Sequence, residues 1–410
     1  MSESCYPAGL IGVDEAVARL VALARESVPS LETLPLAQAA GRVLAADLVA
    51  PLDVPPEANS AMDGFAFRHA DLPASGELPL SQRIPAGIAP APLVPGTAAR
   101  IFTGAIIPAG ADTVVMQEHC DYDDRRVVVA RVPAAGANIR PAGQDIARGQ
   151  VVLARGMRLT PPAIGVVASL GLACLEVYRP LRIALLCTGD ELLAPGEPWR
   201  PGCIYNSNRP MLAALLAGWG FEVIDLGQVA DSQQDTEGAL ANAVASGADV
   251  ILSTGGVSVG EEDHVKAAVQ RRGRLDFWKV AIKPGKPVAV GEVSGVPFIG
   301  LPGNPQSVFV TALVLARPFL LARQGCRQLH SRSARVSAGF ATRKAADRDE
   351  YLRVRLEEGA EARVVPHPQQ SSGALASAVW ADGLALVPAG VQVKEGDILR
   401  YLGFEALLAG

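Results

Sequence analysis

Four short apolar segments in the second half of the chain constrain the fold more than any other feature. Each is followed by glycine, proline or acidic residues, and two segments with helical patterning, 209–217 and 235–246, lie between them. The apolar segments are residues 181–186, 221–226, 250–252 and 296–301. Short apolar runs bounded by turn residues are typical of buried strands, and strands that alternate with helices form parallel sheets. We therefore predict an α/β domain over residues 179–327.

The loops after these predicted strands carry the residues best suited to bind an anion. Because the carboxyl ends of parallel strands meet at one edge of a sheet, we expect these loops to converge there. Glycines in such a loop let backbone N–H groups approach a phosphate closely. Asp263 can hold a metal ion or cap the helix predicted at 265–270. The converging segments are Thr188–Glu191, Asp231, Thr254–Asp263 and Pro302–Pro305.

Three lysines surround a Pro-Gly turn in the same part of the chain. They are Lys279, Lys283 and Lys286. A solvated charged turn is the usual explanation for a single lysine. Spaced lysines beside a glycine turn in an anion-binding domain instead favour contacts with phosphate.

The rest of the chain divides into further domains. Residues 53–138 combine proline-rich stretches with short β-like runs, which predicts a mostly β insert. This insert interrupts a discontinuous, helical N-terminal domain formed by residues 1–52 plus 139–178. Short alternating strands in residues 328–410 predict a small β domain, either a barrel or a sandwich. Helices in the N-terminal domain are expected at residues 13–26, 36–41 and 161–170.

Composition excludes several functional classes. The net charge of −5 argues against a nucleic-acid partner, which requires a basic face. The six cysteines form no C-x-x-C pair, so we expect reduced thiols in a cytoplasmic protein. No signal peptide is apparent at the N-terminus, and the apolar stretch 163–175 is shorter than the roughly 20 residues of a membrane helix.

Seven motifs together resemble the molybdopterin molybdenumtransferase family, the molybdenum insertases that include the E-domain of gephyrin. The resemblance extends from about Val13 into the C-terminal β domain. The motifs are NSAMDGFA at 59–66, RIFTG at 100–104 with GAD at 110–112, GQDI at 143–146, TGDEL at 188–192, STGGVSVGEED at 253–263, KPGKP at 283–287 and GLPGNP at 300–305.

The resemblance implies a reaction and an assembly. Molybdate and adenylated molybdopterin are the implied substrates, Mg²⁺ is the implied cofactor, and molybdenum cofactor and AMP are the products. It also implies an elongated homodimer in which the β insert of one subunit faces the α/β domain of the other. A molybdopterin adenylyltransferase and downstream cofactor-handling proteins are the implied protein partners, with neither nucleic acid nor membrane involved.

The resemblance also implies roles for individual residues. Glu191 and Asp263 are the implied magnesium ligands, and Asp63 and Thr103 are expected to reach across the dimer. The implied catalytic residues are Asp63, Glu191, Asp231, Asp263, Lys279 and Lys283. The implied substrate-binding residues are Thr103, Asp145, Thr188, Gly255, Gly256, Ser258, Lys286, Pro302, Gly303, Asn304, Pro305 and Ser307.

Some of these residues have structural explanations of equal weight. Asp231 can cap the following helix, Asp145 can be a turn residue at a domain junction, and Pro302 and Pro305 can simply stiffen their loop. The chain also departs from the family pattern at Phe65, Gln144 and Gln306. Arg348 and Ser371 in the C-terminal domain are not assigned to the site.

Two rival functions share parts of this pattern. A non-catalytic scaffold, as in gephyrin, would have no need for Glu191, Asp263 and the lysines together. A molybdopterin adenylyltransferase shares the α/β domain, but the motifs at 59–66 and 300–305 and the flanking domains favour the insertase.

Overall fold

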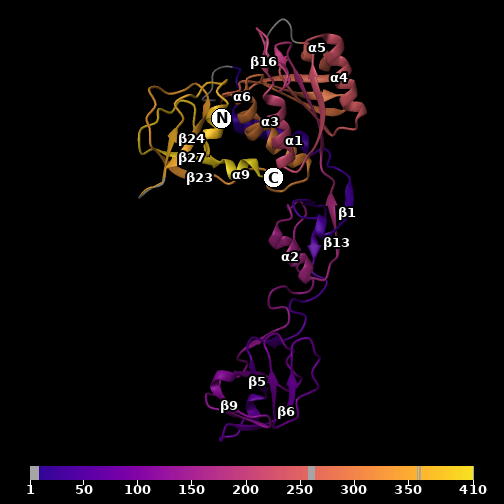
Figure 1. The fold of residues 1–410 in the computed structure, drawn as a ribbon, viewed down its shortest axis with the longest axis vertical. Helices are drawn as coiled ribbons and strands as arrows, with labels where there is room; N and C mark the ends of the chain where they lie inside the picture. Colours follow the sequence, from indigo (N-terminus) through magenta and orange to yellow (C-terminus); the bar gives the residue numbers. More distant parts are fainter. Residues whose placement is uncertain (1–8, 257–263, 358, 360–361, 410) are drawn as a thin grey trace.

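The computed structural model describes residues 9–256, 264–357, 359 and 362–409. The molecule is elongated, with the α/β domain and the C-terminal β domain side by side at one end of the long axis (Figure 1). The insert lies at the opposite end, and a small domain from the N-terminal half connects the two. This arrangement confirms the predicted multidomain α/β architecture with a β insert and a C-terminal β domain.

A six-stranded sheet with the order β17-β14-β18-β22-β21-β19 forms the centre of the α/β domain. The first four strands are parallel, as predicted, and β21 and β19 extend the sheet as antiparallel strands. The sheet is therefore mixed. Its strands are β14 (Arg182–Thr188), β17 (Glu222–Val229), β18 (Val250–Thr254), β19 (Gly273–Lys279), β21 (Pro287–Val293) and β22 (Val296–Leu301).

Helices cover both faces of this sheet. Ile183 and Leu185 of β14 contribute to one core, and the alternate residues Ala184 and Leu186 contribute to the other. Burial on both faces explains why the strands read as continuous apolar runs. One face is covered by α1 (Val13–Ala24), α3 (Asn208–Gly218), α6 (Pro305–Thr311) and α7 (Arg317–Arg323), and the other by α4 (Gln233–Ala245) and α5 (His264–Arg272).

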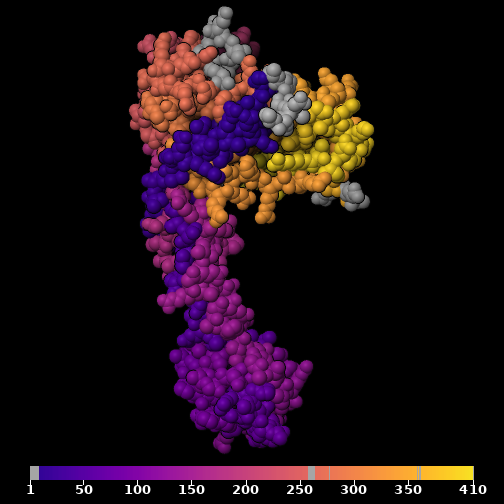
Figure 2. Space-filling view, turned by 180° about the vertical axis from the view of Figure 1, so that it is seen from behind, coloured from indigo at the N-terminus to yellow at the C-terminus, as the bar shows by residue number. Residues whose placement is uncertain are grey.

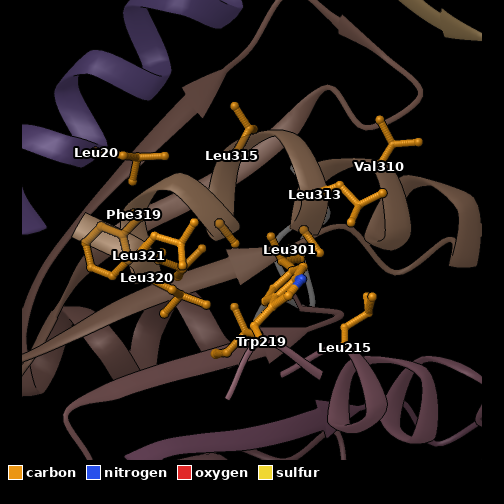
Figure 3. Close-up of a cluster of buried hydrophobic side chains, with 14 of the residues drawn as sticks. Leu20, Leu215, Trp219, Leu301, Val310, Leu313, Leu315, Phe319, Leu320 and Leu321 are labelled. Atoms are coloured by element: carbon orange, nitrogen blue, oxygen red, sulfur yellow. The ribbon is translucent and has the colours of Figure 1, made fainter. Parts of the chain in front are cut away.

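The helical run Pro305–Arg323 fills the centre of the larger core. Leu313, Leu315, Phe319 and Leu320 belong to this core, as does Trp219 (Figure 3). A π-helical segment, Ala312–Ala316, joins α6 to α7. It precedes Pro318, which has no backbone N–H to continue an α-helix. By length and hydropathy alone this run could cross a membrane, but 89% of it is buried inside the domain, as in a core helix of a soluble fold.

Helix α1 packs against the α/β domain and not against the N-terminal domain to which the predicted boundary assigns it. Residues 1–52 were expected to form one domain with residues 139–178, but Val17, Leu20 and Ala24 of α1 are buried in the α/β core with Phe319 and Leu320 of α7. Figure 2 shows the N-terminal segment lying on the α/β domain. The apolar stripe of α1 is complementary to α7, and this contact separates the helix from the strands that follow it.

The small connecting domain combines one helix with short strands. Its sheet has the order β1-β13-β2, and a separate pair joins β3 to β12. A helix was predicted at residues 36–41, but the chain makes only a 3₁₀ turn, Leu36–Gln38, before Gly41 adopts a positive φ of 78°. The elements are β1 (Leu31–Pro35), β2 (Val43–Leu44), β3 (Leu48–Val49), β12 (Val151–Leu153), α2 (Pro161–Ser169) and β13 (Cys174–Tyr178).

The insert is a six-stranded sheet with the order β8-β5-β7-β6-β10-β9. The chain enters and leaves it at one point, where β4 (Asn59–Ser60) pairs with β11 (Ile139–Arg140) and Val54 bridges to Ile146. The sheet strands are β5 (Gly64–Phe67), β6 (Glu77–Ile84), β7 (Ala98–Ile101), β8 (Thr113–Met116), β9 (Cys120–Tyr122) and β10 (Arg126–Val129).

The C-terminal domain is a closed barrel, one of the two predicted alternatives. Its strands follow the order β24-β25-β23-β27-β26, and β26 pairs back to β24. Strand β20 (Ile282–Lys283) of the α/β domain pairs with β24, which fixes the barrel beside the α/β domain. The remaining elements are β23 (Ala334–Ala338), β24 (Asp349–Glu357), β25 (Arg363–Pro366), α8 (Ala376–Trp380), β26 (Gly383–Val387), β27 (Ile398–Gly403) and α9 (Phe404–Leu408).

Candidate active site

A pocket of about 710 Å³ opens at the carboxyl edge of the parallel strands. Register explains why its walls meet: Cys187 of β14 pairs with Thr254 of β18, which pairs with Leu301 of β22. The three loops that follow these strands are therefore adjacent. The pocket is lined by segments 188–189, 191–192, 204–208, 254–256, 283–287, 302–305 and 370–372, with Asp231, Ser307 and Arg348.

Two glycines form the floor where β18 ends. Gly255 has a φ of 87°, and a Cβ on it would lie 2.6 Å from the carbonyl oxygen of Thr188. Gly256 has a φ of 62°, and a Cβ there would lie 2.3 Å from Cγ2 of Val265 on α5. Only glycine fits either position without displacing its neighbours, so backbone rather than side chains faces the pocket.

An asparagine that sequence reasoning missed holds the loops together. The Asn208 side chain donates from Nδ2 to Oγ1 of Thr254 (3.1 Å) and to the carbonyl oxygen of Gly303 (2.7 Å). Thr254 in turn donates to the carbonyl oxygen of Pro302 at 3.3 Å. Asn208 is the first residue of α3 and belongs to no recognisable motif. Its place at the start of a predicted helix was the only sequence feature that could have indicated a role at the pocket.

Several buried polar atoms of the pocket wall have no hydrogen-bond partner among the described residues. They are Oγ1 of Thr188, Nδ2 of Asn206 and Oδ1 of Asn208. Buried polar groups in native proteins are nearly always hydrogen-bonded. Their position in the pocket wall is consistent with partners supplied by a polar ligand.

One side of the pocket is acidic. The backbone N–H of Asp231 donates to Oδ1 of Asp190 (2.9 Å), and that of Asp190 donates to Oδ2 of Asp231 (3.4 Å). Burial raises the pKa of Asp231, and the nearby carboxylates of Asp190 and Glu191 raise it further. Crowded carboxylates favour a bound cation, and oxygen donors of this kind suit Mg²⁺. No cluster of three metal-binding side chains occurs within the described ranges.

The opposite side of the pocket is basic. Lys283 forms an ion pair with Glu350 of the barrel, and Lys286 has an exposed side chain at the pocket. Arg348 donates to the carbonyl oxygen of Ile282 at 3.3 Å, which holds its guanidinium beside the lysines. Arg348 and Ser371, left unassigned from the sequence, thus both line the pocket because β20 pairs with β24.

The thiol that precedes this loop is not a candidate nucleophile. Cys187 is buried, and burial raises its pKa to about 11. It therefore stays protonated at neutral pH.

Most of the predicted site residues meet in this pocket. Ser258 and Asp263 lie outside the described residues. Asp63, Thr103, Asp145 and Lys279 do not line the pocket of their own chain. Those that line it are Thr188, Glu191, Asp231, Gly255, Gly256, Lys283, Lys286, Pro302, Gly303, Asn304, Pro305 and Ser307.

Asp63 and Thr103 form a pair within the insert. Oδ1 of Asp63 accepts hydrogen bonds from the backbone N–H and the hydroxyl of Thr103, each at 2.7 Å. These bonds hold the pKa of the Asp63 carboxyl below its ordinary value. The two side chains are therefore preorganised, and Asp63 is ionised. The insert that carries them lies at the opposite end of the molecule from the pocket (Figure 1).

Asp145 and Lys279 occupy other places. The backbone N–H of Asp145 donates to the carbonyl oxygen of Val54 at the junction of the insert (2.9 Å). Lys279 ends the antiparallel edge strand β19, where its carbonyl oxygen accepts from the N–H of Ile11. Its side chain is exposed and outside the pocket lining.

Family models match three consecutive parts of the chain. Residues 11–171 match the MoeA N-terminal region (domain I and II), and residues 184–322 match a probable molybdopterin binding domain. Residues 335–404 match the MoeA C-terminal region (domain IV).

Similar proteins cover most of the chain. The molybdopterin molybdenumtransferase of Haemophilus influenzae is 43% identical over 299 residues, which are 72% of this chain and 74% of that protein. Molybdopterin molybdenumtransferase 2 of Mycobacterium tuberculosis is 38% identical over 387 residues, 89% and 95% of the two chains. The crystal structure of a molybdopterin biosynthesis MoeA protein from Pyrococcus horikoshii has a TM-score of 0.82 at 28% identity, covering 96% of this chain and 99% of its own.

Proposed function

This chain belongs to the molybdopterin molybdenumtransferase family, and we propose that it transfers molybdenum into adenylated molybdopterin, releasing AMP and molybdenum cofactor. The observation that carries the proposal is the pocket at the carboxyl edge of the sheet, which has an acidic wall, a basic wall and a glycine floor between them. An adenylated pterin and molybdate are both anionic. Positive charge and backbone N–H groups must therefore surround them in a site of low dielectric.

The glycine floor suits the phosphate end of the pterin. Gly255 and Gly256 leave backbone exposed to the pocket, and the Thr188 hydroxyl has no hydrogen-bond partner in the part of the chain that the structure describes. Pro302, Asn304 and Pro305 form the adjoining wall, where the pterin would lie. These roles bind and orient the substrate, which lowers the barrier by positioning.

The acidic wall is the proposed magnesium site. Glu191 and Asp231 line it, and Asp263 is the second ligand proposed from the sequence. Bound Mg²⁺ would neutralise charge on the phosphate groups as the bond to AMP breaks. Asp231 would lie beside the metal ion. Burial and the neighbouring carboxylates raise its pKa, and a bound cation would offset that repulsion.

The basic wall is the proposed molybdate site. Lys283, Lys286 and Arg348 place three cationic groups on the side of the pocket opposite the acids. Lys283 is paired with Glu350 and Arg348 with Asp347, so Lys286, which has no ion pair among the described residues, offers the least neutralised charge. Cationic clamps of this kind also stabilise charge in phosphoryl transfer.

We further propose that two copies of the chain assemble in the cytoplasm and complete each other's sites. Asp63 and Thr103 form an ionised, preorganised pair, yet the insert that carries them lies far along the molecule from its own pocket. A second chain that places its insert over the pocket would bring this pair to the substrate. A molybdopterin adenylyltransferase would supply the adenylated substrate.

The test is AMP release from adenylated molybdopterin with Mg²⁺, with and without molybdate. We expect molybdate-dependent release in the wild type and a loss of about 10²-fold or more in Glu191→Ala. Glu222→Ala is the matched control, because Glu222 is an exposed acid on β17, distant from the pocket lining.

Each failure has a distinct meaning. Binding of the adenylate without AMP release at any molybdate concentration would refute the transferase proposal in favour of a scaffold. Consumption of ATP and molybdopterin instead would indicate an adenylyltransferase. Full activity in Glu191→Ala would refute the metal assignment alone.

A further inference from the structure

Arg353 is a buried arginine directly behind the pocket. It lies on β24, and only 1% of it is exposed. Its guanidinium donates from Nε to Oγ of Ser377 (3.1 Å) and from Nη2 to the carbonyl oxygen of Ser371 (3.3 Å). Both acceptors are neutral, and Ser371 is itself part of the pocket wall.

No carboxylate balances this charge among residues 9–256, 264–357, 359 and 362–409. None of the ion pairs between residues in these ranges includes Arg353. Burial is the sole cause that lowers the pKa of Arg353, to about 10. The group therefore stays protonated at neutral pH. Arginine is almost never fully buried unless it is paired, because removing its charge from water is costly.

Arg353 also fixes the pocket wall through its backbone. Its N–H donates to Oε1 of Gln370 (3.1 Å), and its carbonyl oxygen accepts from Nε2 of Gln370 (2.9 Å). Gln370 and Ser371 are adjacent pocket residues, and both are thus held by one residue of the barrel.

Gln306, a departure from the family pattern, secures the same segment from the α/β domain. Its backbone N–H donates to the carbonyl oxygen of Ser372 (2.9 Å), and its Nε2 donates to Oγ of Ser377 (2.9 Å). Ser377 therefore accepts from both Gln306 and Arg353. A closed polar network joins the start of α6 to the barrel behind the pocket.

We propose that Arg353 is a positioning residue that makes this end of the pocket selective for dianions. It acts through Ser371, whose carbonyl it holds, and through its uncompensated charge, which an oxyanion in the pocket would balance. In a site of low dielectric such a charge acts over several ångströms. The proposal rests on the proposed function, since it takes molybdate as the ligand at the basic wall.

The experiment compares two tetrahedral oxyanions of similar shape that differ by one charge. Binding of molybdate alone and of perrhenate alone is measured by calorimetry on the full-length wild type, Arg353→Met, Arg353→Lys and Arg355→Met. Arg355 is the matched control because it lies two residues along β24 with an exposed guanidinium on Trp380.

We expect Arg353→Met to bind molybdate about tenfold more weakly than the wild type, with perrhenate affinity changed by less than about threefold. Arg353→Lys retains the charge and should keep most of the preference for molybdate. The melting temperature of ligand-free Arg353→Met should stay close to that of the wild type, because the variant loses two guanidinium hydrogen bonds but also removes a buried charge that no carboxylate among the described residues balances. Arg355→Met should match the wild type in both affinities.

Three results would overturn the proposal: equal losses for molybdate and perrhenate, unchanged molybdate affinity in Arg353→Met, or no binding of either anion to the wild type. If Arg353→Met did not fold, loss of the molybdate preference in a folded Arg353→Lys would equally contradict a role for charge. Failure of the proposed function would look different. The wild type would then release no AMP, while the preference for molybdate over perrhenate would persist and still depend on Arg353.

Discussion

Replacing Gly255 by alanine should separate pocket geometry from overall stability. A Cβ at this position would lie 2.6 Å from the carbonyl oxygen of Thr188, whereas ordinary contact begins at 3.4 Å. The loops after β14 and β18 must therefore move apart by 0.8 Å, the difference between these distances. A misplacement of about 1 Å can reduce turnover by about 10²-fold. We expect a loss of that order in kcat/KM for adenylated molybdopterin.

The positive φ of Gly255 also carries a conformational cost. Holding a non-glycine residue in the left-handed region costs about 1–2 kcal/mol, so Gly255→Ala should be slightly less stable than the wild type. Gly390→Ala is the control for this cost: Gly390 has a φ of 77°, and a Cβ there would meet nothing within 4 Å. It should lose similar stability and keep full activity.

The assay combines AMP release with thermal unfolding of both variants. Our reasoning predicts two variants of similar stability and very different activity. Equal activity of Gly255→Ala and Gly390→Ala would refute it, because the close approach of Thr188 would then have no bearing on the site. Aggregation of Gly255→Ala alone would show that the loop governs folding rather than substrate positioning.

Two further predictions concern charge and assembly. Asp231→Asn should raise the stability of the ligand-free protein at neutral pH, because the raised pKa means that folding disfavours the ionised carboxyl; this gain should vanish as the pH falls below the ordinary value of 3.8, and a pH series of melting temperatures checks it. Mixed dimers of Asp63→Asn and Glu191→Ala chains should regain activity, about a quarter of the wild type for random pairing, since half of the dimers would hold one complete site. An unfractionated mixture of differently tagged chains provides the measurement, mixed dimers isolated through both tags should reach about half of the wild-type activity, and complete inactivity would contradict a site shared between subunits.

The predicted site residues that the structure brings into one pocket are mainly those that follow parallel strands. Thr188, Gly255 and Pro302 come together because β14, β18 and β22 are neighbours in register. The position of each strand follows from local patterns in the chain, whereas the register joins strands that are distant in sequence. Lys279 illustrates the limit of this reasoning. It lies four residues before Lys283 in the same charged segment, but it ends an antiparallel edge strand, and its side chain stays outside the pocket lining.

The residues missed by sequence reasoning depend on contacts between domains. Arg348 and Ser371 reach the pocket only because β20 pairs with β24 across the domain boundary, a contact for which no local pattern exists. The same holds for helix α1, whose apolar stripe predicts burial but not the surface that buries it. Long-range packing of this kind is set by shape and exposed area, which a single sequence does not display.

The β4–β11 pair makes the insert a separable module. Because the chain enters and leaves at adjacent points, where Ser60 pairs with Ile139 and Val54 with Ile146, everything between them could be removed and the gap closed by a short linker. Such a junction lets an insert change in length or sequence without altering the sheet that carries the pocket. The two parts of the molecule are therefore free to evolve at different rates, and exchange of inserts between relatives becomes a practical way to ask what each insert contributes.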